Sequence, residues 1–268
     1  MKTKLKVYRL NFGDNPVHIS DARADYGSGE KTIHSDTLHA ALIACLAKVG
    51  HEIPDEGNLG CVLSSLFPYY KEAYFLPRPL LNFNLGKEDL GEWSKKIKKV
   101  KWLDAKHFSF MLRNEIFDFH IMEKKKSWEF FSDLELPEKF IDFQIVPRVA
   151  VPRSESDHKG ETNIFYFERM TFAKDAGLYF IAKGETMLLE KSLKILQYEG
   201  IGSDRNVGYG SFTFEKNELE LELPDDADYA MNLSLYCPSD KKEWENLGNY
   251  ANGGENVRYE LIKRGGWL

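Results

Sequence analysis

The order of sequence patterns along the chain predicts an α+β fold built from antiparallel sheets. Residues 4–12 and 211–223 alternate polar and apolar residues, with the period of a half-buried strand. Residues 35–50 and 185–198 instead carry apolar residues at the spacing of a helix. Several strand patterns follow one another without a helix between them, which is typical of antiparallel sheets covered by helices on one face.

The patterns also divide the chain into two halves. We expect one α+β half in residues 1–150 and a second in residues 151–268. In the first half, Ser35 or Asp36 is expected to cap the helix that runs to Gly50. The other elements expected there are a helix at 58–67, a strand at 73–76, a basic amphipathic helix at 92–112 and, at 114–138, an irregular aromatic stretch that would suit a protruding hairpin. The strands expected toward the C-terminus are 142–152, 162–171, 177–183, 229–236 and 257–262.

Composition indicates an ordinary globular protein. The chain has 268 residues, of which 43% are hydrophobic, so it can bury a core without disulfides or metals. The cysteines Cys45, Cys61 and Cys237 are far apart and form no CxxC pair, which favours reduced thiols over zinc ligands. The sequence has no signal-like segment and no apolar run that could span a bilayer. We therefore expect a cytoplasmic protein without cofactor, metal or membrane contact.

The charge balance bears on possible partners. The net charge is −6, whereas many free-standing nucleic-acid-binding domains are basic. A local basic groove remains compatible with this balance, and acidic surface elsewhere suits a subunit that docks on other proteins.

The segment from Gly200 to Gly210 is the strongest functional candidate. Its sequence, Gly-Ile-Gly-Ser-Asp-Arg-Asn-Val-Gly-Tyr-Gly, has four glycines that permit positive φ and the close approach of another backbone. Its amides, Ser203 and Arg205 are predicted to bind phosphates, although Arg205 could equally pair with Glu199. The segment lacks the Gly-Lys-Ser/Thr of a P-loop, and it follows a helix rather than a strand, which excludes a dinucleotide fingerprint. A plain helix-to-strand connection is the alternative.

Three side chains near residue 36 admit several interpretations. His34, Asp36 and His39 have a spacing that could place metal ligands on one helix face, but no third strong ligand is evident nearby. His34 or His18 could serve as the general base of a nuclease, because histidine titrates near neutral pH. The favoured interpretation is a helix cap, with His34 bonded to backbone or phosphate.

Basic residues elsewhere extend the candidate interface. Arg148 and Arg153 flank a Val-Ala-Val-Pro segment beside the polar stretch 154–161, where they could contact phosphates or bases or remain solvated edge charges. The five lysines of Lys95–Lys101 are either a solvated helix face or one wall of an electrostatic groove.

Several of these motifs occur in the order in which one family has them. They are the N-terminal strand, Ile33-His-Ser-Asp-Thr-Leu, Phe75-Leu-Pro-Arg-Pro, Lys99-Val-Lys-Trp-Leu, the strand ending at Arg153, Gly177-Leu-Tyr-Phe, the glycine segment and Leu233-Ser-Leu-Tyr-Cys-Pro. Together they make the chain resemble the RAMP superfamily of CRISPR proteins over nearly its whole length. Within that superfamily it looks like the fourth subunit of the type III-A effector, the Csm complex.

The resemblance implies two ferredoxin-like (RRM-like) halves and a β-hairpin thumb that wedges into the guide–target RNA duplex. It implies a non-catalytic subunit that holds the 5′ tag of the crRNA. The implied protein partners are the large polymerase-like subunit and the adjacent backbone RAMP subunit, which cuts target RNA. The implied RNA-binding residues are Gly200, Gly202, Ser203, Arg205, Gly208, Gly210, His34, Ser35, Asp36, Arg78 and Arg153, to which the local pattern adds Arg148.

The chain also departs from the family pattern. His39 replaces an expected aromatic, and the thumb could lie at 114–138, 154–161 or 13–30. The chain stops at Arg264-Gly-Gly-Trp-Leu, where family members usually continue through a final strand, so the second half is expected to lack an element. Two other functions stay open: a crRNA-processing endoribonuclease that uses His34, and the equivalent subunit of a type III-B effector.

Overall fold

The computed structural model describes residues 1–19, 31–53, 55–86, 93–150, 163–227, 230–251 and 257–262. An eight-stranded sheet runs through its centre and is antiparallel except for its last pair. Its strands in spatial order are β10 (Thr213–Glu222), β1 (Lys2–Asn11), β9 (Ala176–Gly184), β3 (Phe67–Tyr70), β4 (Ala73–Pro77), β5 (Trp102–Asp104) and β6 (Phe130–Phe131), while β2 (Cys61–Leu63) also pairs with β9. The predicted α+β class with antiparallel pairing is therefore confirmed.

Strand β9 is the centre of this sheet. It pairs with β1 on one edge and with β2 and β3 on the other. Its first seven residues, Ala176–Ala182, are all buried, because both faces of the strand are covered. Residues from both predicted halves therefore build one sheet, and the division at residue 150 stays a prediction.

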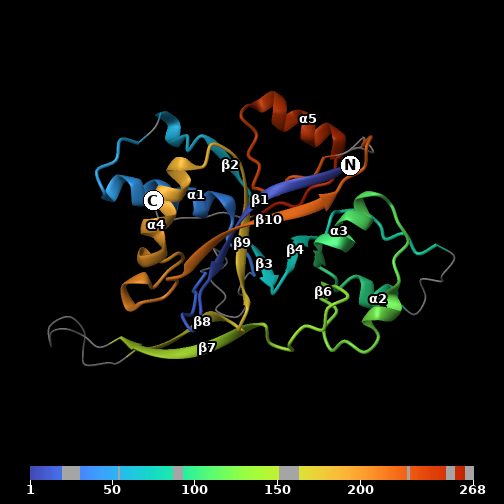
Figure 1. Cartoon of the computed structure of the whole chain (residues 1–268), viewed down its shortest axis with the longest axis horizontal. Coiled ribbons are helices and arrows are strands. Elements are labelled where there is room, and N and C mark those ends of the chain that lie inside the picture. Colours follow the sequence, from blue (N-terminus) through green and yellow to red (C-terminus); the bar gives the residue numbers. More distant parts are fainter. Residues whose placement is uncertain are drawn as a thin grey trace.

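Two helices cover one face of the sheet, α1 (Ser35–Lys48) and α4 (Met187–Glu199) (Figure 1). Leucines on one side of each helix are fully buried in the core. The Tyr8 hydroxyl of β1 donates a hydrogen bond of 2.8 Å to Glu190 of α4, which fixes this helix over the sheet. Lys48 and Glu199 form an ion pair, so the C-terminal ends of the two helices lie together.

A second group of short elements lies in the sequence between β4 and β7. It contains α2 (Ser94–Ile97), α3 (Ala105–Leu112) and the 3₁₀ turn η2 (Phe119–Met122). The predicted single helix at 92–112 is therefore wrong, because β5 interrupts it and buries Trp102 and Leu103. The protruding hairpin considered for 114–138 is also wrong. Its aromatics pack into the core and are at most 7% exposed: Phe117, Phe119, Trp128, Phe130 and Phe131.

Strands β7 (Ile141–Ala150) and β8 (Asn163–Phe172) form a separate two-stranded ribbon along the lower edge of the view in Figure 1. They pair antiparallel over ten residues each, from Ile141↔Phe172 to Ala150↔Asn163. The stretch 154–161 lies outside the described residues, between these two strands. These two strands, rather than residues 114–138, form the long antiparallel pair outside the main sheet.

Three other expectations differ from the structure. Residues 58–67 form β2 and the approach to β3 rather than a helix, because their backbone pairs with β9. Among the described residues of 229–236 and 257–262 there is no strand, since no neighbouring strand pairs with them. The helix α5 (Lys241–Ala251) was not predicted from the sequence, and the short turns η1 (Asp55–Gly57) and η3 (Arg205–Val207) complete the fold. Within the described ranges, no helix is long and apolar enough to cross a membrane.

Candidate nucleic-acid interface

The glycine-rich loop Gly200–Gly210 connects α4 to β10 and rests on the segment that follows β1. The Ser203 amide donates to the His18 carbonyl over 2.9 Å, and the Gly210 amide donates to the Pro16 carbonyl over 2.9 Å. Within the loop, the Ile201 amide donates to the Gly210 carbonyl over 2.9 Å. Part of the amide set predicted to hold phosphates is therefore used to fix the loop to its own chain.

Most of the loop glycines are required by this close packing. A Cβ on Gly200 would lie 2.6 Å from the Tyr209 carbonyl oxygen, and one on Gly202 would lie 2.5 Å from the His18 carbonyl oxygen. A Cβ on Gly210 would lie 2.0 Å from the Ile201 carbonyl oxygen. Gly208 also has a positive φ, of 90°, but nothing lies within 4 Å of its Cβ position. Only this part of the loop is open to the approach of an external backbone.

The β7–β8 ribbon supports the loop from the other side. Residues opposite each other in an antiparallel pair share a face, so Arg148 and Phe165 lie on one face together with Phe167. The Arg148 guanidinium lies 4.0 Å from the centre of the Phe167 ring and 5.4 Å from that of Tyr209. It also forms an ion pair of 3.2 Å with Asp204. Arg148 thus fastens the loop to the ribbon.

Arg205 is the exposed cation of the loop. It begins η3, directly after Asp204, which has a left-handed backbone with φ of 60°. The alternative partner considered for Arg205 was Glu199, whose carboxylate forms an ion pair with Lys48. The charge of Arg205 makes a smaller contribution than Lys48 to the lowered pKa of Glu199. No ion pair to Arg205 occurs within the parts of the chain that the structure describes. Its guanidinium is therefore available for a phosphate.

Replacing Arg148 with methionine is expected to lower the free energy of unfolding by about 1–2 kcal/mol, because the Asp204 ion pair and the stacking on Phe167 are lost. Thermal and urea denaturation measure this change. Arg205→Met serves as the control, since Arg205 is exposed and should change stability by less than about 0.5 kcal/mol. Equal effects of the two substitutions would contradict the supporting role of Arg148.

The His34-Ser35-Asp36 motif lies at the start of α1. His34 occupies the N-cap position and makes no capping hydrogen bond with its side chain, so neither Ser35 nor Asp36 is the N-cap residue. The prediction is right in part, because Asp36 Oδ1 accepts from the first-turn amide of Thr37 over 2.6 Å, and the Ser65 hydroxyl accepts from the Ser35 amide over 3.1 Å. The Ser35 hydroxyl instead accepts a hydrogen bond of 3.0 Å from the Leu235 amide. The C-terminal end of α1 lies near the glycine loop, so 14 helical residues, about 20 Å, separate this motif from it. The structure does not bring the two together.

Arg78 is turned into the protein. Its Nη1 donates to the Ile97 carbonyl over 3.2 Å, its Nη2 reaches the Leu81 carbonyl at 3.5 Å, and the guanidinium lies 4.6 Å from the Phe83 ring centre. Burial lowers the pKa of Arg78. Arg78 therefore satisfies backbone carbonyls beyond the end of β4, far from the glycine loop, while Arg153 lies outside the described residues.

Sequence reasoning missed Arg169 as a support of the loop and considered His18 only as a general base. Arg169 donates to the Gln144 side chain over 2.9 and 3.1 Å, and its Nη1 lies 3.5 Å from the Tyr209 hydroxyl. His18 hydrogen-bonds to the Glu168 carbonyl and packs edge-on against Phe167. Neither role was identifiable in advance, because that of Arg169 depends on partners 25 and 40 residues away and that of His18 on a partner 150 residues away. His18 is thus held between the ribbon and the loop.

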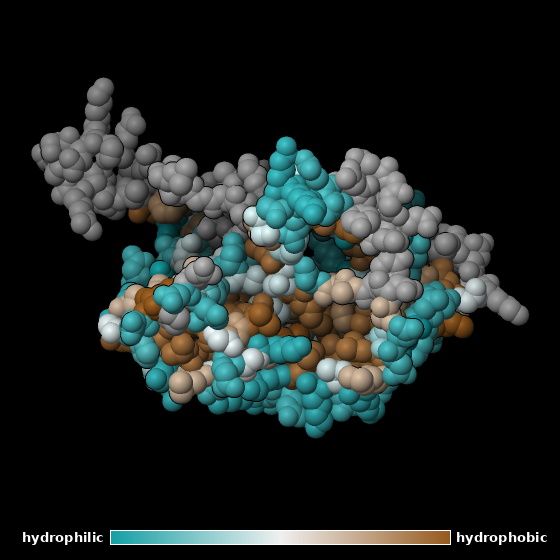
Figure 2. Space-filling model, turned by 90° about the horizontal axis from the view of Figure 1, so that it is seen from above, coloured by the Kyte–Doolittle hydropathy of each residue, from teal (hydrophilic) through white to brown (hydrophobic). Residues whose placement is uncertain are grey.

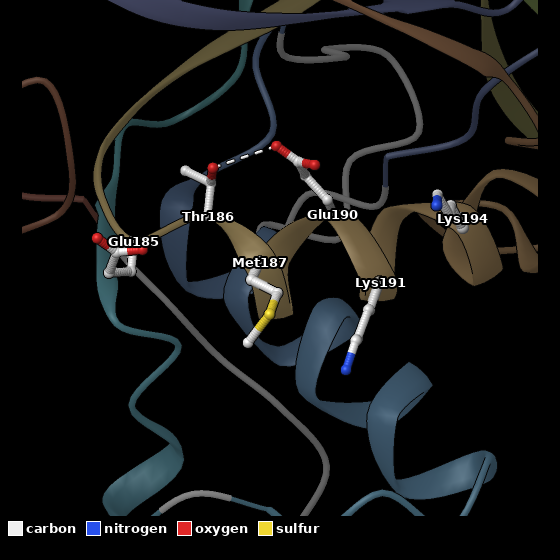
Figure 3. Close-up of a pocket in the computed structure, with 6 residues that line it drawn as sticks. All are labelled: Glu185, Thr186, Met187, Glu190, Lys191 and Lys194. Carbon is white, nitrogen blue, oxygen red and sulfur yellow. Dashed lines mark hydrogen bonds between the residues drawn. The ribbon is translucent and has the colours of Figure 1, made fainter.

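The remaining candidates to consider are a metal site, His39 and a surface hollow. Among the described residues, no group of three His, Cys, Asp or Glu side chains could hold a metal ion. His39 hydrogen-bonds to the Gly57 carbonyl over 2.9 Å. A shallow hollow lies at the start of α4 (Figure 3), lined by Glu185, Thr186, Met187, Glu190, Lys191 and Lys194.

Glu190 is the central group of this hollow and supports the fold. It accepts hydrogen bonds from Lys216 at 2.6 Å, Tyr8 at 2.8 Å and Thr186 at 3.1 Å. The hydrogen bond from Lys216 is the main reason why the pKa of Glu190 lies below its ordinary value. Burial is the main cause that raises the pKa of Tyr8 to about 12. Glu190 is therefore an ionised structural carboxylate with its acceptors occupied.

A largely antiparallel sheet with helices on one face, joined to a two-stranded ribbon and a glycine-rich loop, defines a mixed α+β protein. The sequence profile of the RAMP superfamily matches residues 14–213, and the chain belongs to this superfamily. The predicted resemblance is thus confirmed at the level of the family.

Curated relatives specify the family further. The "CRISPR system Cms protein Csm4" of Thermococcus onnurineus is 26% identical over 250 residues, which cover 87% of this chain and 74% of the relative. The protein of the same name in Streptococcus thermophilus is 23% identical over 98% of this chain and 80% of its own length. This similarity confirms the predicted resemblance to the fourth subunit of the type III-A effector.

Solved structures show the same fold. The "Csm1-Csm4 cassette in complex with AMPPNP" has a TM-score of 0.58 at 22% identity, covering 89% of this chain and 80% of that chain. The "Csm3-Csm4 subcomplex in the type III-A CRISPR-Cas interference complex" has a TM-score of 0.50 at 20% identity, covering 82% of this chain and 70% of that chain.

Proposed function

We propose that this chain is a non-catalytic RNA-binding subunit of a type III-A CRISPR interference complex, where it holds the 5′ tag of the crRNA. The observation that carries the proposal is the glycine loop, which is fixed to Pro16–His18 and to the ribbon while Gly208 and Arg205 stay open to solvent. A rigid loop with an unpaired guanidinium binds phosphate without first having to be ordered. Ser203 and the amides near Gly208 complete the proposed contact.

The β7–β8 ribbon is proposed as the thumb that contacts the guide–target duplex. One of its faces holds the glycine loop, while the opposite face packs into the core at one end, where Ile141 and Met170 are buried. Farther along the ribbon this opposite face is apolar and exposed, with Ile145 and Ile164 at 60% and 62% and Tyr166 at 55%. Apolar and aromatic groups on a narrow ribbon suit contact with stacked bases. Of the stretches considered for the thumb, 154–161 is the one that lies in the sequence between the two strands of this ribbon.

The proposed protein partners are a large polymerase-like subunit and a neighbouring backbone RAMP subunit. The names of the solved relatives, a Csm1-Csm4 cassette and a Csm3-Csm4 subcomplex, support this pairing. Seen from above, apolar side chains gather in the middle of one broad face between hydrophilic borders (Figure 2). In addition, Val62 of the edge strand β2 is 70% exposed and Met187 of α4 is 65% exposed. Surfaces of this kind are typical of subunit contacts.

Arg205→Glu is expected to reduce crRNA retention in the assembled complex about tenfold, because one phosphate contact is replaced by repulsion, worth roughly 1.5–3 kcal/mol. The complex is reconstituted, purified and analysed for RNA content per complex. Lys242→Glu, an equal charge change on exposed α5, is the control. Unchanged assembly and RNA content with Arg205→Glu would show that the loop assignment is wrong.

The alternative function, a crRNA-processing endoribonuclease, predicts a different result with repeat RNA. His34, its proposed base, is only 8% exposed at the N-cap of α1 and so has little access to a substrate. Incubating the purified chain with labelled repeat RNA in the absence of divalent metal tests this reading. A specific product that disappears with His34→Ala would replace the scaffold function.

A further inference from the structure

The lysine-rich segment Lys95–Lys101 carries a concentrated positive charge that the glycine loop does not use. The segment comprises the one-turn helix α2 and the residues that lead into β5. Figure 1 shows α2 and α4, after which the glycine loop begins, at opposite ends of the long axis of the molecule. The two basic sites are therefore distinct surfaces.

The backbone of this segment is rigidly anchored. Trp93, Ile97 and Val100 are at most 7% exposed, and Trp93 stacks on Trp128 with ring centres 5.4 Å apart. The Lys96 ammonium lies 5.0 Å and 5.1 Å from the centres of these two rings. The aromatic base fixes the inner side of the segment, which leaves the other four lysines on the outside.

The outer lysines form no ion pair with any residue that the structure describes. Lys95, Lys98, Lys99 and Lys101 are all exposed, and the ion pairs of the described residues include none of them. The acidic neighbours Glu88, Asp89 and Glu92 lie outside the described residues. Arg78 lies directly beneath, bonded to the Ile97 carbonyl, and no described carboxylate pairs with it either. The half-buried guanidinium adds to the potential of the lysines.

Repulsion among these lysines lowers the stability of the folded protein. Lys95 lies in α2 and Lys98 is its C-cap residue, and like charges three residues apart destabilise a helix by about 0.2–0.5 kcal/mol. The described residues from 93 to 103 include five lysines and no carboxylate. A surface of this kind is suited to an anionic ligand.

We propose that Lys95, Lys98, Lys99 and Lys101 form a second RNA-binding surface, which holds the phosphate backbone without reading sequence. A lysine ammonium is a flexible point charge that suits phosphates. A protein partner is disfavoured, because protein interfaces are depleted in lysine and enriched in apolar and aromatic side chains at their centre. None of the described residues from 93 to 103 is an exposed large hydrophobic. This surface goes beyond the proposed tag site and does not depend on it.

The test replaces all four lysines with glutamine in the full chain. Binding of a fluorescent 20-nucleotide oligouridine, which lacks any tag sequence, is measured by polarisation over a range of salt concentrations. Affinity at low salt should fall at least tenfold, and the slope of log K against log salt should fall by about 0.7 for each lost phosphate contact. The melting temperature should not decrease, since repulsion is relieved.

The matched control replaces Lys174, Lys183, Lys191 and Lys242, four exposed lysines on different elements, with glutamine. Equal losses of affinity in both variants would overturn the proposal, because only net charge would then matter. Unchanged oligouridine binding together with lost co-purification of a protein subunit would also overturn it in favour of protein docking. Tag retention tested by Arg205→Glu is a separate readout, so failure of one proposal leaves the other standing.

Discussion

Replacing Gly210 with alanine is expected to lower the free energy of unfolding by roughly 3 kcal/mol and to detach the glycine-rich loop. The backbone φ of 76° disfavours any side chain, at a cost of about 1–2 kcal/mol. The added Cβ would also lie 2.0 Å from the Ile201 carbonyl oxygen, and relieving such a clash costs about 1–3 kcal/mol. Urea denaturation measures the loss, and crRNA retention in the complex should fall with it.

Gly208→Ala is the matched control. Gly208 has a similar φ of 90°, but nothing lies within 4 Å of its Cβ position, so only the backbone cost of about 1–2 kcal/mol applies. The difference between the two variants isolates the contact between the two ends of the loop. If both variants lost the same stability, the close contact between Ile201 and Gly210 would not explain why residue 210 is a glycine.

Asp104→Ala is expected to lower the free energy of unfolding by roughly 3 kcal/mol. The substitution removes both a helix cap and the hydrogen bonds that a buried carboxylate accepts. Asp104 is 8% exposed and caps α3 by accepting from the His107 amide at 2.9 Å. The same oxygen hydrogen-bonds to the His107 ring at 2.7 Å. Asp118→Ala is the control, because Asp118 is an exposed cap of η2 and should cost less than about 1 kcal/mol.

The contribution of Asp104 should also depend on pH. Burial raises the pKa of this carboxyl, but the bonds and charge of His107, with Ser132, outweigh burial and hold the pKa below its ordinary value. A carboxyl with a lowered folded-state pKa stabilises the protein above its unfolded pKa and loses that effect as it becomes protonated. Stability should therefore fall below about pH 4 in the wild type and less steeply in Asp104→Ala. Parallel curves would contradict this account.

Local patterns predicted the elements that are governed by local physics. Strands β1 and β10 and helices α1 and α4 follow from their apolar periods, which match one buried face each. The helix expected at 58–67 failed because β2 and β3 are fixed by pairing with β9, more than 100 residues further along. The strand expected at 229–236 failed for the opposite reason, since its pattern found no neighbouring strand.

The candidate site was predictable in composition and less so in geometry. The glycines of the loop indicated that a backbone approaches closely, but three of them accommodate carbonyls of this chain itself. Arg78 and Arg148 are indistinguishable from surface cations in the sequence, yet one bonds to carbonyls and the other stacks on Phe167. Among the arginines of the predicted set that the structure describes, Arg205 is the one whose guanidinium forms no ion pair and stays exposed.

The position of β9 between β1 and β3 determines when this protein can fold during synthesis. The first strand, β1, pairs with β9 and with β10, and its Lys2 meets Glu222, 220 positions later. A nascent chain must therefore keep ten strand-forming residues unpaired until most of the protein has left the ribosome. Such non-local pairing slows folding and exposes strand edges to aggregation. Because the glycine loop directly precedes β10, this delay places completion of the sheet at nearly the same moment as completion of the proposed RNA-binding loop.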